Sequence, residues 1–464
     1  MGGSRLRRSV AAAVFCAACL LSCRSIPTPE PTDGGRVAGW QQDLTYLRDE
    51  FPRYNNSFDE HSLAQFDSIV SATLADVDRL SDNQIYVRLL QAIATPDDVH
   101  TSMSLTPSRG KIRRLPIRFY WFSDGLYVVR ARADQSDLLG SRVVSIAGSS
   151  AESVLQQMRA LIPGNQTWVN YESAYYMSSP DILEGMGVSP DSDMVEIEFE
   201  TPAGSRVMRT LEAMPLGEAV WGYRIWRELS PRAAVNMDAP DFAHVLDVDS
   251  APLYLDEPNR SAWWRLIEND SVLYLQVNQT ANFNSDFRDI ARELERLFAR
   301  RAIEAVVVDL RLNTGGNFLL TNTLVRGIPE WHNGEGPIYI VVGGATLSAG
   351  IVTAARLKYY AGDRAVVVGE PAAEGLMFWA ESEVFILPNS QLRVFTGHRY
   401  HNWATTDYDR SKRHFWLMRR MGVAAGDLAI DLPAESSFDD YLAARDPALE
   451  AIVDHLASRA GSVR

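Results

Sequence analysis

The sequence comprises 464 residues, of which 46% are hydrophobic and 22% are charged. This composition is typical of a globular protein, and the length suffices for two or three domains with cores of their own. The formal net charge is −14. Such a balance excludes a nucleic-acid partner, because no basic stripe is present to neutralise phosphates, and it indicates a solvated acidic surface.

The N-terminus has the pattern of a targeting segment. Three arginines precede an apolar run over residues 10–21, which is too short to span a bilayer as a mature helix. The run ends in Leu20-Leu21-Ser22-Cys23, which is similar to a bacterial lipobox. We expect a lipoprotein signal peptide over residues 1–23, a flexible tether over 24–39, and export to the cell envelope, either the periplasm or the cell surface. Ordinary signal cleavage nearby is the alternative.

All cysteines of the chain lie in this segment, at Cys16, Cys19 and Cys23. After processing, no pair is left to form an internal disulfide. We therefore interpret Cys23 as the site of lipid attachment, and the expected membrane contact is made through that lipid anchor.

A helical pattern follows the tether. Leu44, Leu47 and Phe51 share one helix face, and Ser81 with Gln84 has the spacing of a capping box. We predict a small helical N-terminal domain over residues 40–112. Its last helix ends at about Pro96, so His100 is expected in a loop.

Between residues 113 and 215 apolar residues recur at every second position, which is the spacing of a β-strand. A hairpin is predicted from the alternating run at 117–121, the turn Ser123-Asp124-Gly125 and the returning strand 126–130. A further strand is expected over 139–148, and Ser149 with Glu152 is the predicted cap of the next helix. Residues 216–256 carry few periodic signals and are interpreted as a connecting region.

From residue 257 to residue 464, strands alternate with helices. Apolar strands are predicted at 272–277, 303–310, 338–342 and 365–368, with an amphipathic helix at 285–298. This alternation is typical of an α/β domain whose helices cover the sheet.

Two tight turns in this α/β region have the residues of a hydrolytic site. Gly343-Gly344-Ala345-Thr346-Leu347-Ser348-Ala349-Gly350 follows one predicted strand and precedes a helix, so Ser348 occupies a strand-to-helix turn where a nucleophile is exposed. Gly315 and Gly316 follow the preceding strand, where bare backbone N–H groups can approach a ligand. We expect Ser348 to act as nucleophile and the N–H groups of Gly315, Gly316 and Ala349 to form an oxyanion hole; the alternative is that these small residues only serve the turns.

The motifs around these turns resemble the tail-specific (C-terminal processing) serine proteases, nearer the histidine-using branch of the tricorn core protease and the retinoid-binding repeats. The matching segments, in chain order, are Asp97-Asp98-Val99-His100-Thr101, Asp309 to Gly316 (D-L-R-x-N-x-G-G), Ser348 with Ala349, Val368 to Pro371 (V-G-E-P), Leu387 to Ser390 (L-P-N-S) and Arg445 to Glu450 (R-D-P-x-L-E). The resemblance implies a crotonase/Clp-protease-like domain over 257–464 and a degenerate PDZ-like domain over 113–215. An insertion at 163–191 interrupts the latter, and a structural spacer is an equal alternative to a peptide-binding module.

A serine hydroxyl needs a positioned base. In the lysine-using branch of the family the base follows the V-G-E segment, but Gly375 stands at that place here, and Lys358 lies too far along the helix. The resemblance to the histidine-using branch therefore assigns the general base to His100, whose imidazole has a suitable pKa near 6.5. The alternative is that His100 only caps a helix or binds backbone.

The third group of the site stays open. The tricorn-type pattern has a serine before the histidine and a glutamate further on, and this chain has Val99 and Arg419 there. Substitutes are Glu370, Glu374 and Asp407. The histidines at 398, 401 and 414 have no spacing of a zinc site, so neither a metal nor a cofactor is expected.

These residues predict a serine peptidase that cleaves exported proteins or peptides through an acyl-enzyme. Two other functions remain open. One is a non-catalytic protein that binds a ligand or peptide on the same fold, which the missing lysine favours and the retention of Ser348, His100 and the glycine pair opposes. The other is hydrolysis of a small amide or ester, with Phe378, Trp379, Tyr400 and Trp403 as an apolar pocket.

Overall fold

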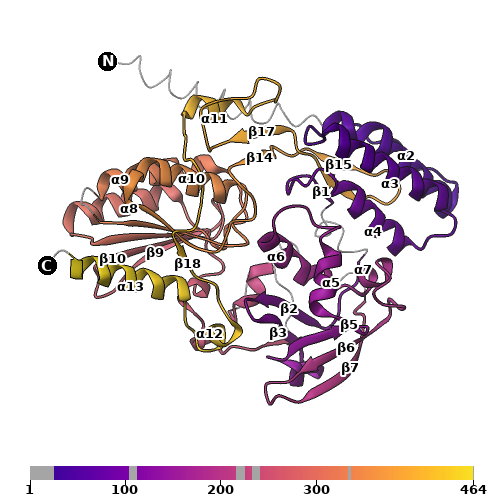
Figure 1. Cartoon of the computed structure of the whole chain (residues 1–464), viewed down its shortest axis with the longest axis horizontal. Coiled ribbons are helices and arrows are strands. Elements are labelled where there is room, and N and C mark those ends of the chain that lie inside the picture. Colours follow the sequence, from indigo (N-terminus) through magenta and orange to yellow (C-terminus); the bar gives the residue numbers. More distant parts are fainter. Residues whose placement is uncertain (1–25, 104–111, 216–224, 233–240, 333–335, 463–464) are drawn as a thin grey trace.

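The structure is a computed structural model that describes residues 26–103, 112–215, 225–232, 241–332 and 336–462. The predicted signal peptide, with the lipidation site Cys23, lies outside these residues. An α/β unit at one end of the molecule is joined to a helical unit and to an antiparallel sheet (Figure 1). No helix in the described part of the chain combines the length and apolar character needed to cross a bilayer.

The helices of eight or more residues, in chain order, are α2 (Gly35–Tyr54), α3 (Glu60–Asp76), α4 (Asp82–Ile93), α5 (Ala151–Met158), α6 (Gln166–Tyr176), α8 (Phe287–Arg300), α9 (Asn322–Trp331), α10 (Ala349–Ala361) and α13 (Pro447–Ser462). Shorter helices are α7 (Pro180–Gly185), α11 (Trp416–Met421) and α12 (Phe438–Leu442). The strands of the α/β unit are β9 (Ala262–Ile267), β10 (Val272–Val277), β11 (Ala305–Asp309), β12 (Ile338–Val342), β13 (Ala365–Gly369) and β18 (Leu432–Pro433).

The α/β unit is built on a six-stranded sheet in the order β18-β13-β12-β11-β10-β9. Its strands are parallel except for β9, which pairs antiparallel with β10 at the edge. All residues of β10, β11 and β12 are buried, as expected for central strands that are covered on both faces. The sequence-based strands of this region are confirmed to within a few residues.

The two faces of this sheet have separate cores. Val306 and Val308 belong to the cluster that includes α8, α9 and α10. Val307, one residue out of phase, belongs to the cluster that includes Ala448 and Ile452 of α13. Figure 1 shows α8, α9 and α10 on one side of the sheet and α13 on the other. Successive side chains of β11 thus point to opposite faces of the sheet, so this strand contributes to both cores.

The N-terminal helices α2, α3 and α4 form the expected helical unit. Ser81 and Gln84 make the predicted capping box at the start of α4, with bonds of 3.1 and 3.0 Å in the two directions. The buried carboxylate of Asp43 on α2 accepts hydrogen bonds of 2.8 Å from the backbone N–H groups of Asn389 and Ser390. The L-P-N-S turn therefore rests on α2, far from its place in the sequence.

A seven-stranded antiparallel sheet has the main order β2-β3-β4-β6-β7. These strands are β2 (Ile117–Phe122), β3 (Gly125–Arg132), β4 (Arg142–Ile146), β6 (Met194–Glu200) and β7 (Arg206–Glu212). In addition, β5 (Ser149–Ser150) pairs with β4, and β8 (Phe242–His244), from the predicted connecting region, pairs with β3. The hairpin of β2 and β3 is confirmed. Two local expectations are wrong. Strand β4 begins only at Arg142, because a 3₁₀ helix at 133–138 precedes it, and the cap of α5 is Ser150, which accepts from the N–H of Ser153, rather than Ser149.

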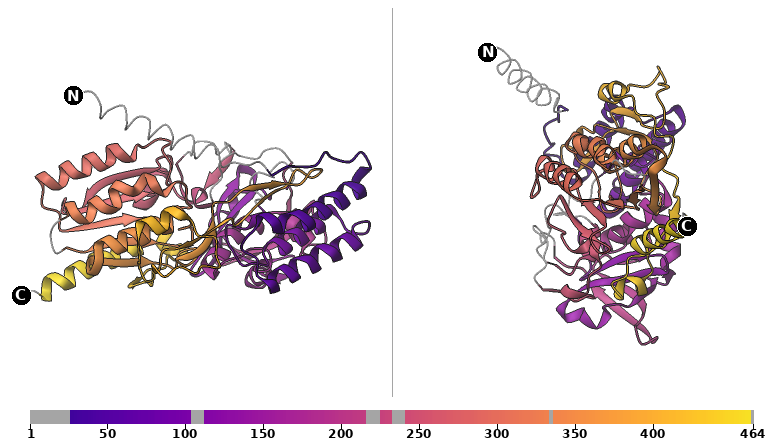
Figure 2. Two further views of the ribbon diagram at one scale, coloured as in Figure 1. Left: turned by 90° about the horizontal axis from the view of Figure 1, so that it is seen from above. Right: turned by 90° about the vertical axis from the view of Figure 1, so that its left-hand side faces the viewer.

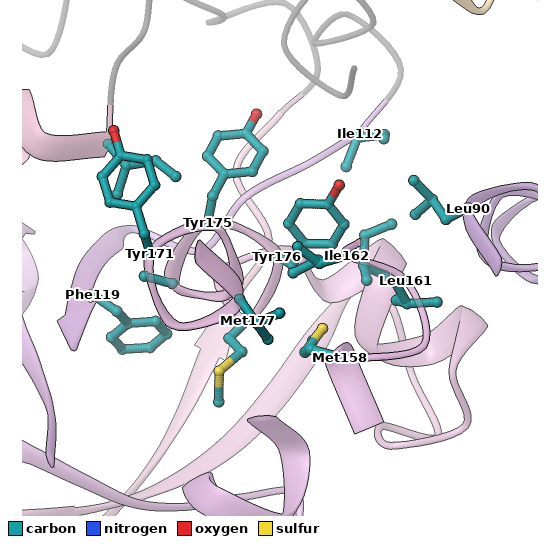
Figure 3. Packing of buried hydrophobic residues seen from close by; sticks show 14 of the residues in the cluster. Leu90, Ile112, Phe119, Met158, Leu161, Ile162, Tyr171, Tyr175, Tyr176 and Met177 are labelled. Atoms are coloured by element: carbon teal, nitrogen blue, oxygen red, sulfur yellow. The ribbon is translucent and has the colours of Figure 1, made fainter. Parts of the chain in front are cut away.

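The insertion at 163–191 contains α6 and α7, and one hydrophobic core unites it with the helical unit. Figure 3 shows Leu90 of α4 beside Leu161 and Ile162, with Tyr176 and Met177 close by. The predicted domain ranges stay predictions. Two segments from the C-terminal part of the chain, however, pack outside the α/β unit. Strands β15 (Val384–Ile386) and β16 (Arg393–Phe395) join β1 (Ser102–Met103), and α12 packs against the antiparallel sheet.

Strands β14 (Met377–Ala380) and β17 (Arg399–Asn402) form the bridge between the units. In Figure 1 they lie between α10 and β15, and the view from above in Figure 2 shows the same segment between the α/β unit and the helices. This bridge brings the loop after α4 close to the carboxyl ends of the parallel strands.

Candidate active site

Ser348 lies at the turn between β12 and α10. Its backbone has φ 53° and ψ −118°, a conformation that residues other than glycine rarely adopt. The side chain makes no capping hydrogen bond to α10 and is only partly buried. A serine on a strained strand-to-helix turn presents its hydroxyl in front of the helix N-terminus. Ser348 therefore lies on a strand-to-helix turn, as the sequence predicted, although α10 begins at Ala349 rather than near Ile351.

The glycine turn after β11 lies directly against Ser348. A Cβ atom on Gly315 would be 2.9 Å from Ser348 Cβ and 3.4 Å from Oγ. The N–H of Leu347 donates to the carbonyl of Asn313 at 2.9 Å, and this bond joins the two turns. Gly316 has φ 130°, and a Cβ there would be 2.2 Å from the carbonyl oxygen of Thr280. Glycine is required at both positions because there is no space for a side chain.

The three expected oxyanion donors differ in their hydrogen bonds. The N–H of Gly315 donates to Asn313 Oδ1 at 2.9 Å. Among the described residues, the N–H groups of Gly316 and Ala349 have no acceptor. Two of the three donors are thus free to bind an oxygen, and Gly315 chiefly provides the space in which Ser348 fits.

Arg311 fixes the glycine turn to the C-terminal segment. Its guanidinium binds both oxygens of Asp446 at 2.8 and 3.0 Å and pairs with Asp309 at 2.8 Å. The buried Tyr274 donates to Asp309 Oδ2 at 2.7 Å. A bidentate, buried pair of this kind holds a loop in one geometry. The D-L-R and R-D-P motifs, 135 residues apart, therefore meet in one ion-pair network.

His100 lies in the loop after α4, as expected, and faces a carboxylate. Its Nδ1 is 3.4 Å from Oε1 of Glu374, and its ring stacks on Phe378 at 5.4 Å between centroids with an interplanar angle of 10°. Both ring nitrogens are buried, and neither has a hydrogen-bond partner within the described residues. Of the carboxylates that the sequence left open, the structure pairs Glu374 with the histidine.

A buried polar network holds the His100 loop. Asp98 Oδ2 accepts from the hydroxyl of Thr101 at 2.6 Å, and Thr101 in turn contacts Asn55 Oδ1 at 3.0 Å. Asn55 also accepts from the N–H of Gly397 at 2.6 Å, where a Cβ would be only 2.6 Å from Asp98 Oδ2. Sequence reasoning gave Asp98 no role, although it lies in the motif that identified His100.

The charges around His100 oppose the effect of its burial. Burial by itself lowers the pKa of this imidazole, but the carboxylates of Glu374 and Asp98 raise it, and the net shift is upward. Burial, together with the charge of Glu374, raises the pKa of Asp98 to about 7 although the positive form of His100 acts in the opposite direction.

The segment that carries Glu374 connects the histidine to the serine turn. The N–H of Ala373 donates to the carbonyl of Thr346 at 3.0 Å. From the insertion, the side chain of Asn165 donates to the carbonyl of Ala372 at 2.5 Å, and Thr167 donates to that of Pro371 at 2.9 Å. No hydrogen bond joins His100 to Ser348 in the part of the chain that the structure describes. Such contacts often form only when substrate binds.

The remaining candidates have other partners. Lys358 donates to Asp427 at 2.9 Å and is therefore not aimed at Ser348. Burial raises the pKa of Glu370 to about 7, with the charge of Glu435 adding to the effect. Asp407 is exposed and makes only local backbone contacts. A Cβ on Gly375, the position of the lysine in the other branch, would meet nothing within 4 Å.

A cavity of about 500 Å³ lies beside the serine turn. Gly343, Gly344 and Ala345 form one wall, Glu370 and Pro371 form another, and the ends of β2 and α6 close it. Both units of the molecule therefore contribute to it. The aromatic residues that were expected to form an apolar pocket do not line this cavity. Instead, Phe378 is stacked between His100 and His401, and Trp403 is fully buried.

Comparisons with known proteins identify the fold. No family model matches the sequence, and no curated protein matches it. Among solved structures, mature CPAF matches with a TM-score of 0.57 and 12% identity, over 91% of this chain and 96% of that chain. Mature CPAF complexed with lactacystin matches with a TM-score of 0.54 and 12% identity, over 91% and 97%. The tricorn protease aligns with a TM-score of only 0.34 and 13% identity, over 91% and 37%, which is too low to support a conclusion.

The chain therefore shares its fold with CPAF, a serine protease. The mixed α/β fold that the sequence predicted is confirmed at this level. At 12% identity the likeness concerns the architecture alone.

Proposed function

We propose that this chain is a serine peptidase in which Ser348 is the nucleophile, His100 is the general base and Glu374 orients the histidine. One observation carries the proposal: a serine in a strained conformation, in contact with Gly315, is joined through Ala373 to a buried histidine–carboxylate pair. A serine on a strained strand-to-helix turn is typical of a nucleophile. Such a hydroxyl is activated by a base that a third group orients.

The proposed reaction proceeds through an acyl-enzyme. Ser348 Oγ attacks the carbonyl carbon of the scissile bond and transfers its proton to Nε2 of His100, while Nδ1 faces Glu374. The N–H groups of Gly316 and Ala349 bind the oxyanion of the tetrahedral intermediate. His100 then donates the proton to the leaving amine, and a water molecule, activated by the same imidazole, releases the acyl group.

The substrate is proposed to be an extended peptide. The cavity of about 500 Å³ is lined by residues of both units, with charged groups such as Arg311, Glu370 and Arg142 at its walls. Ser348 and His100 do not line it, so it would hold a part of the peptide at a distance from the scissile bond. The antiparallel sheet contributes β2 to this cavity, which supports a role of the PDZ-like region in positioning the chain. A small amide or ester would use only part of this space.

A non-catalytic binding protein is the second candidate. The specific observation in its favour is that His100 has no hydrogen bond to Ser348 and that both of its nitrogens are buried. The two candidates differ in whether Ser348 reacts with an electrophile.

The test is labelling with a fluorophosphonate, followed by mass-spectrometric mapping of the adduct. We expect a single adduct at Ser348, no labelling of Ser348→Ala, and unchanged circular dichroism of that variant. As a matched control, Ser390→Ala alters a serine that contacts the helical unit and should leave labelling intact. An adduct on another serine, or none on a folded protein, would contradict the peptidase assignment.

We further propose that the mature protein is anchored to a membrane of the cell envelope by lipid on Cys23. The lipobox pattern at residues 20–23 supports this proposal. Mass spectrometry of the mature N-terminus should find a diacylated Cys23. An unmodified N-terminus beyond Cys23 would instead show ordinary secretion.

A further inference from the structure

Three potential metal ligands meet at His100. One ligand atom each from Asp98, His100 and Glu374 lies within 4.8 Å of the other two. Asp98 and His100 come from the loop after α4, and Glu374 comes from the segment after β13. The helical unit and the α/β unit thus supply one cluster together.

Two of the three side chains, His100 and Glu374, have buried polar atoms that make no hydrogen bond among the described residues, whereas Asp98 accepts one from Thr101. Both ring nitrogens of His100 and Oε1 of Glu374 are buried without a hydrogen bond among the described residues. Only 9% of the Glu374 side chain is exposed, and 7% of Asp98. Buried polar atoms are normally satisfied by a partner. A cation at this point would bind these atoms directly.

The ligand set distinguishes among cations. One imidazole and two carboxylates suit Zn²⁺, which takes three protein ligands of these types and leaves a fourth position open. Mg²⁺ and Ca²⁺ prefer oxygen ligands alone. Zn–N and Zn–O bonds are about 2.0–2.2 Å long, so the cluster has to contract slightly around the ion. Phe378 is stacked on the ring of His100 and closes one side of the site.

We propose that Asp98, His100 and Glu374 form a Zn²⁺ site that blocks the peptidase reversibly. An imidazole whose nitrogen lone pair is bound to zinc cannot accept the proton of Ser348, and Glu374 can no longer orient the ring. Only the inhibitory effect rests on the proposed function. Binding of the metal depends on the three side chains alone.

The chain contains a matched control for this site. His401 Nε2 is 3.4 Å from Oε1 of Glu381, the same separation as between His100 and Glu374. In the described part of the chain no second carboxylate completes a cluster there. Glu381→Gln therefore removes a carboxylate next to a histidine near the site without altering the proposed ligands.

The first experiment measures Zn²⁺ affinity by competition with a chromophoric chelator, using the processed Ser348→Ala protein, which excludes turnover and lacks the cysteines of the signal peptide. We expect one bound ion per chain, and a loss of affinity of tenfold or more in each of Asp98→Asn and Glu374→Gln. Glu381→Gln should bind as tightly as the parent. Equal affinity in all variants, or a loss confined to Glu381→Gln, would overturn the site.

Co²⁺ provides a second measurement that does not depend on the folding of a ligand variant. The only cysteines lie within residues 1–23, so Co²⁺ bound to the processed protein should show ligand-field absorption without a thiolate charge-transfer band. Addition of Zn²⁺ should abolish this absorption. A cobalt spectrum of six-coordinate, hydrated ion alone would count against the site.

Inhibition of the unaltered protein then separates the two proposals. Stoichiometric Zn²⁺ should prevent fluorophosphonate labelling of Ser348, and a chelator should restore it. If Zn²⁺ binds and Ser348 is never labelled, the site stands and the peptidase assignment fails. If Ser348 is labelled equally with and without Zn²⁺, the inhibitory site is wrong and the peptidase assignment stands.

Discussion

The backbone N–H of Ala373 donates a 3.0 Å hydrogen bond to the carbonyl oxygen of Thr346. This bond joins the segment that ends in Glu374 to the turn that ends in Ser348. Glu374 also faces His100 at 3.4 Å. A backbone hydrogen bond thus joins the carboxylate segment to the serine turn, and a side-chain contact brings the histidine to the carboxylate, although the three residues come from distant parts of the sequence.

The pH dependence of turnover should report the charge of His100. Only the neutral imidazole accepts a proton, and the pKa of His100 is raised by the carboxylates of Glu374 and Asp98 despite burial. Therefore kcat/KM should rise with pH, with a midpoint above the ordinary value of 6.5. Glu374→Gln removes a charge that raises this pKa, so its midpoint should move to lower pH. Initial rates on a peptide ester across pH 5–9 measure both effects.

Two controls accompany this profile. Glu381→Gln should displace the midpoint less than Glu374→Gln, because the charge of Glu381 contributes least among the causes identified for His100. His100→Asn should lower turnover by about 10²–10⁴-fold, the usual cost of losing a general base. A midpoint that stays in place in Glu374→Gln would show that this carboxylate does not act on the base.

Backbone strain at Ser348 predicts a difference between two inactive variants. Non-glycine residues in sparsely populated conformations are destabilised by on the order of 1–3 kcal/mol. Ser348→Gly relieves this strain and Ser348→Ala does not, so the glycine variant should be the more stable by about 1 kcal/mol, since the entropy of glycine in the unfolded chain offsets part of the gain. Urea denaturation of the pair measures the difference. Equal stabilities would show that the turn is unstrained.

Replacement by alanine should damage the protein at Gly316 and have little effect at Gly375. A Cβ at Gly316 would be 2.2 Å from a backbone oxygen, whereas one at Gly375 meets nothing within 4 Å. Gly316→Ala should lower the free energy of unfolding by about 2 kcal/mol or more, because φ is positive there and the clash involves backbone, and it should abolish labelling of Ser348. Gly375→Ala should retain stability and labelling. Thermal unfolding and fluorophosphonate labelling of both variants decide between these outcomes.

Lys358 offers a test against a lysine mechanism. Its ammonium group is bound to Asp427 at 2.9 Å, so Lys358→Met should keep turnover near that of the parent. The exposed ion pair should contribute no more than about 1 kcal/mol to stability. A large loss of turnover with the fold intact would transfer the role of base from His100 to this lysine.

Asp98 should lower stability at alkaline pH. Burial raises its pKa to about 7 in the folded state, whereas an aspartate in an unfolded chain titrates near 3.9. The folded protein therefore binds the proton of Asp98 more tightly than the unfolded chain does. The ionised group has no destabilising effect below the unfolded pKa. The effect grows as pH rises from the unfolded to the folded pKa, and it is complete above the folded pKa. Asp98→Asn should be more stable than the parent at pH 8, by a few kcal/mol at most, and nearly equal at pH 4. Urea denaturation at both values provides the comparison.

Local patterns in the sequence determined much of the fold. Nearly continuous apolar runs located β10, β11 and β12, because strands buried on both faces need apolar residues at successive positions. The capping box at Ser81 and the hairpin of β2 and β3 were predicted because their signals involve residues two to four positions apart. The serine turn was recognised for the same reason, from glycines next to one serine.

The sequence by itself thus determined where the serine turn, the glycine turn and the histidine loop lie along the chain. Only the tertiary structure decided which carboxylate faces His100, since Glu370, Glu374 and Asp407 were equivalent in sequence. That choice depends on the hydrogen bond from Ala373 to Thr346 and on contacts from the insertion at Asn165. Burial of the Asp98 carboxylate was likewise invisible, because desolvation comes from segments hundreds of residues away. Local signals specify turns and strands, whereas the charge and partners of a side chain depend on neighbours that folding brings together.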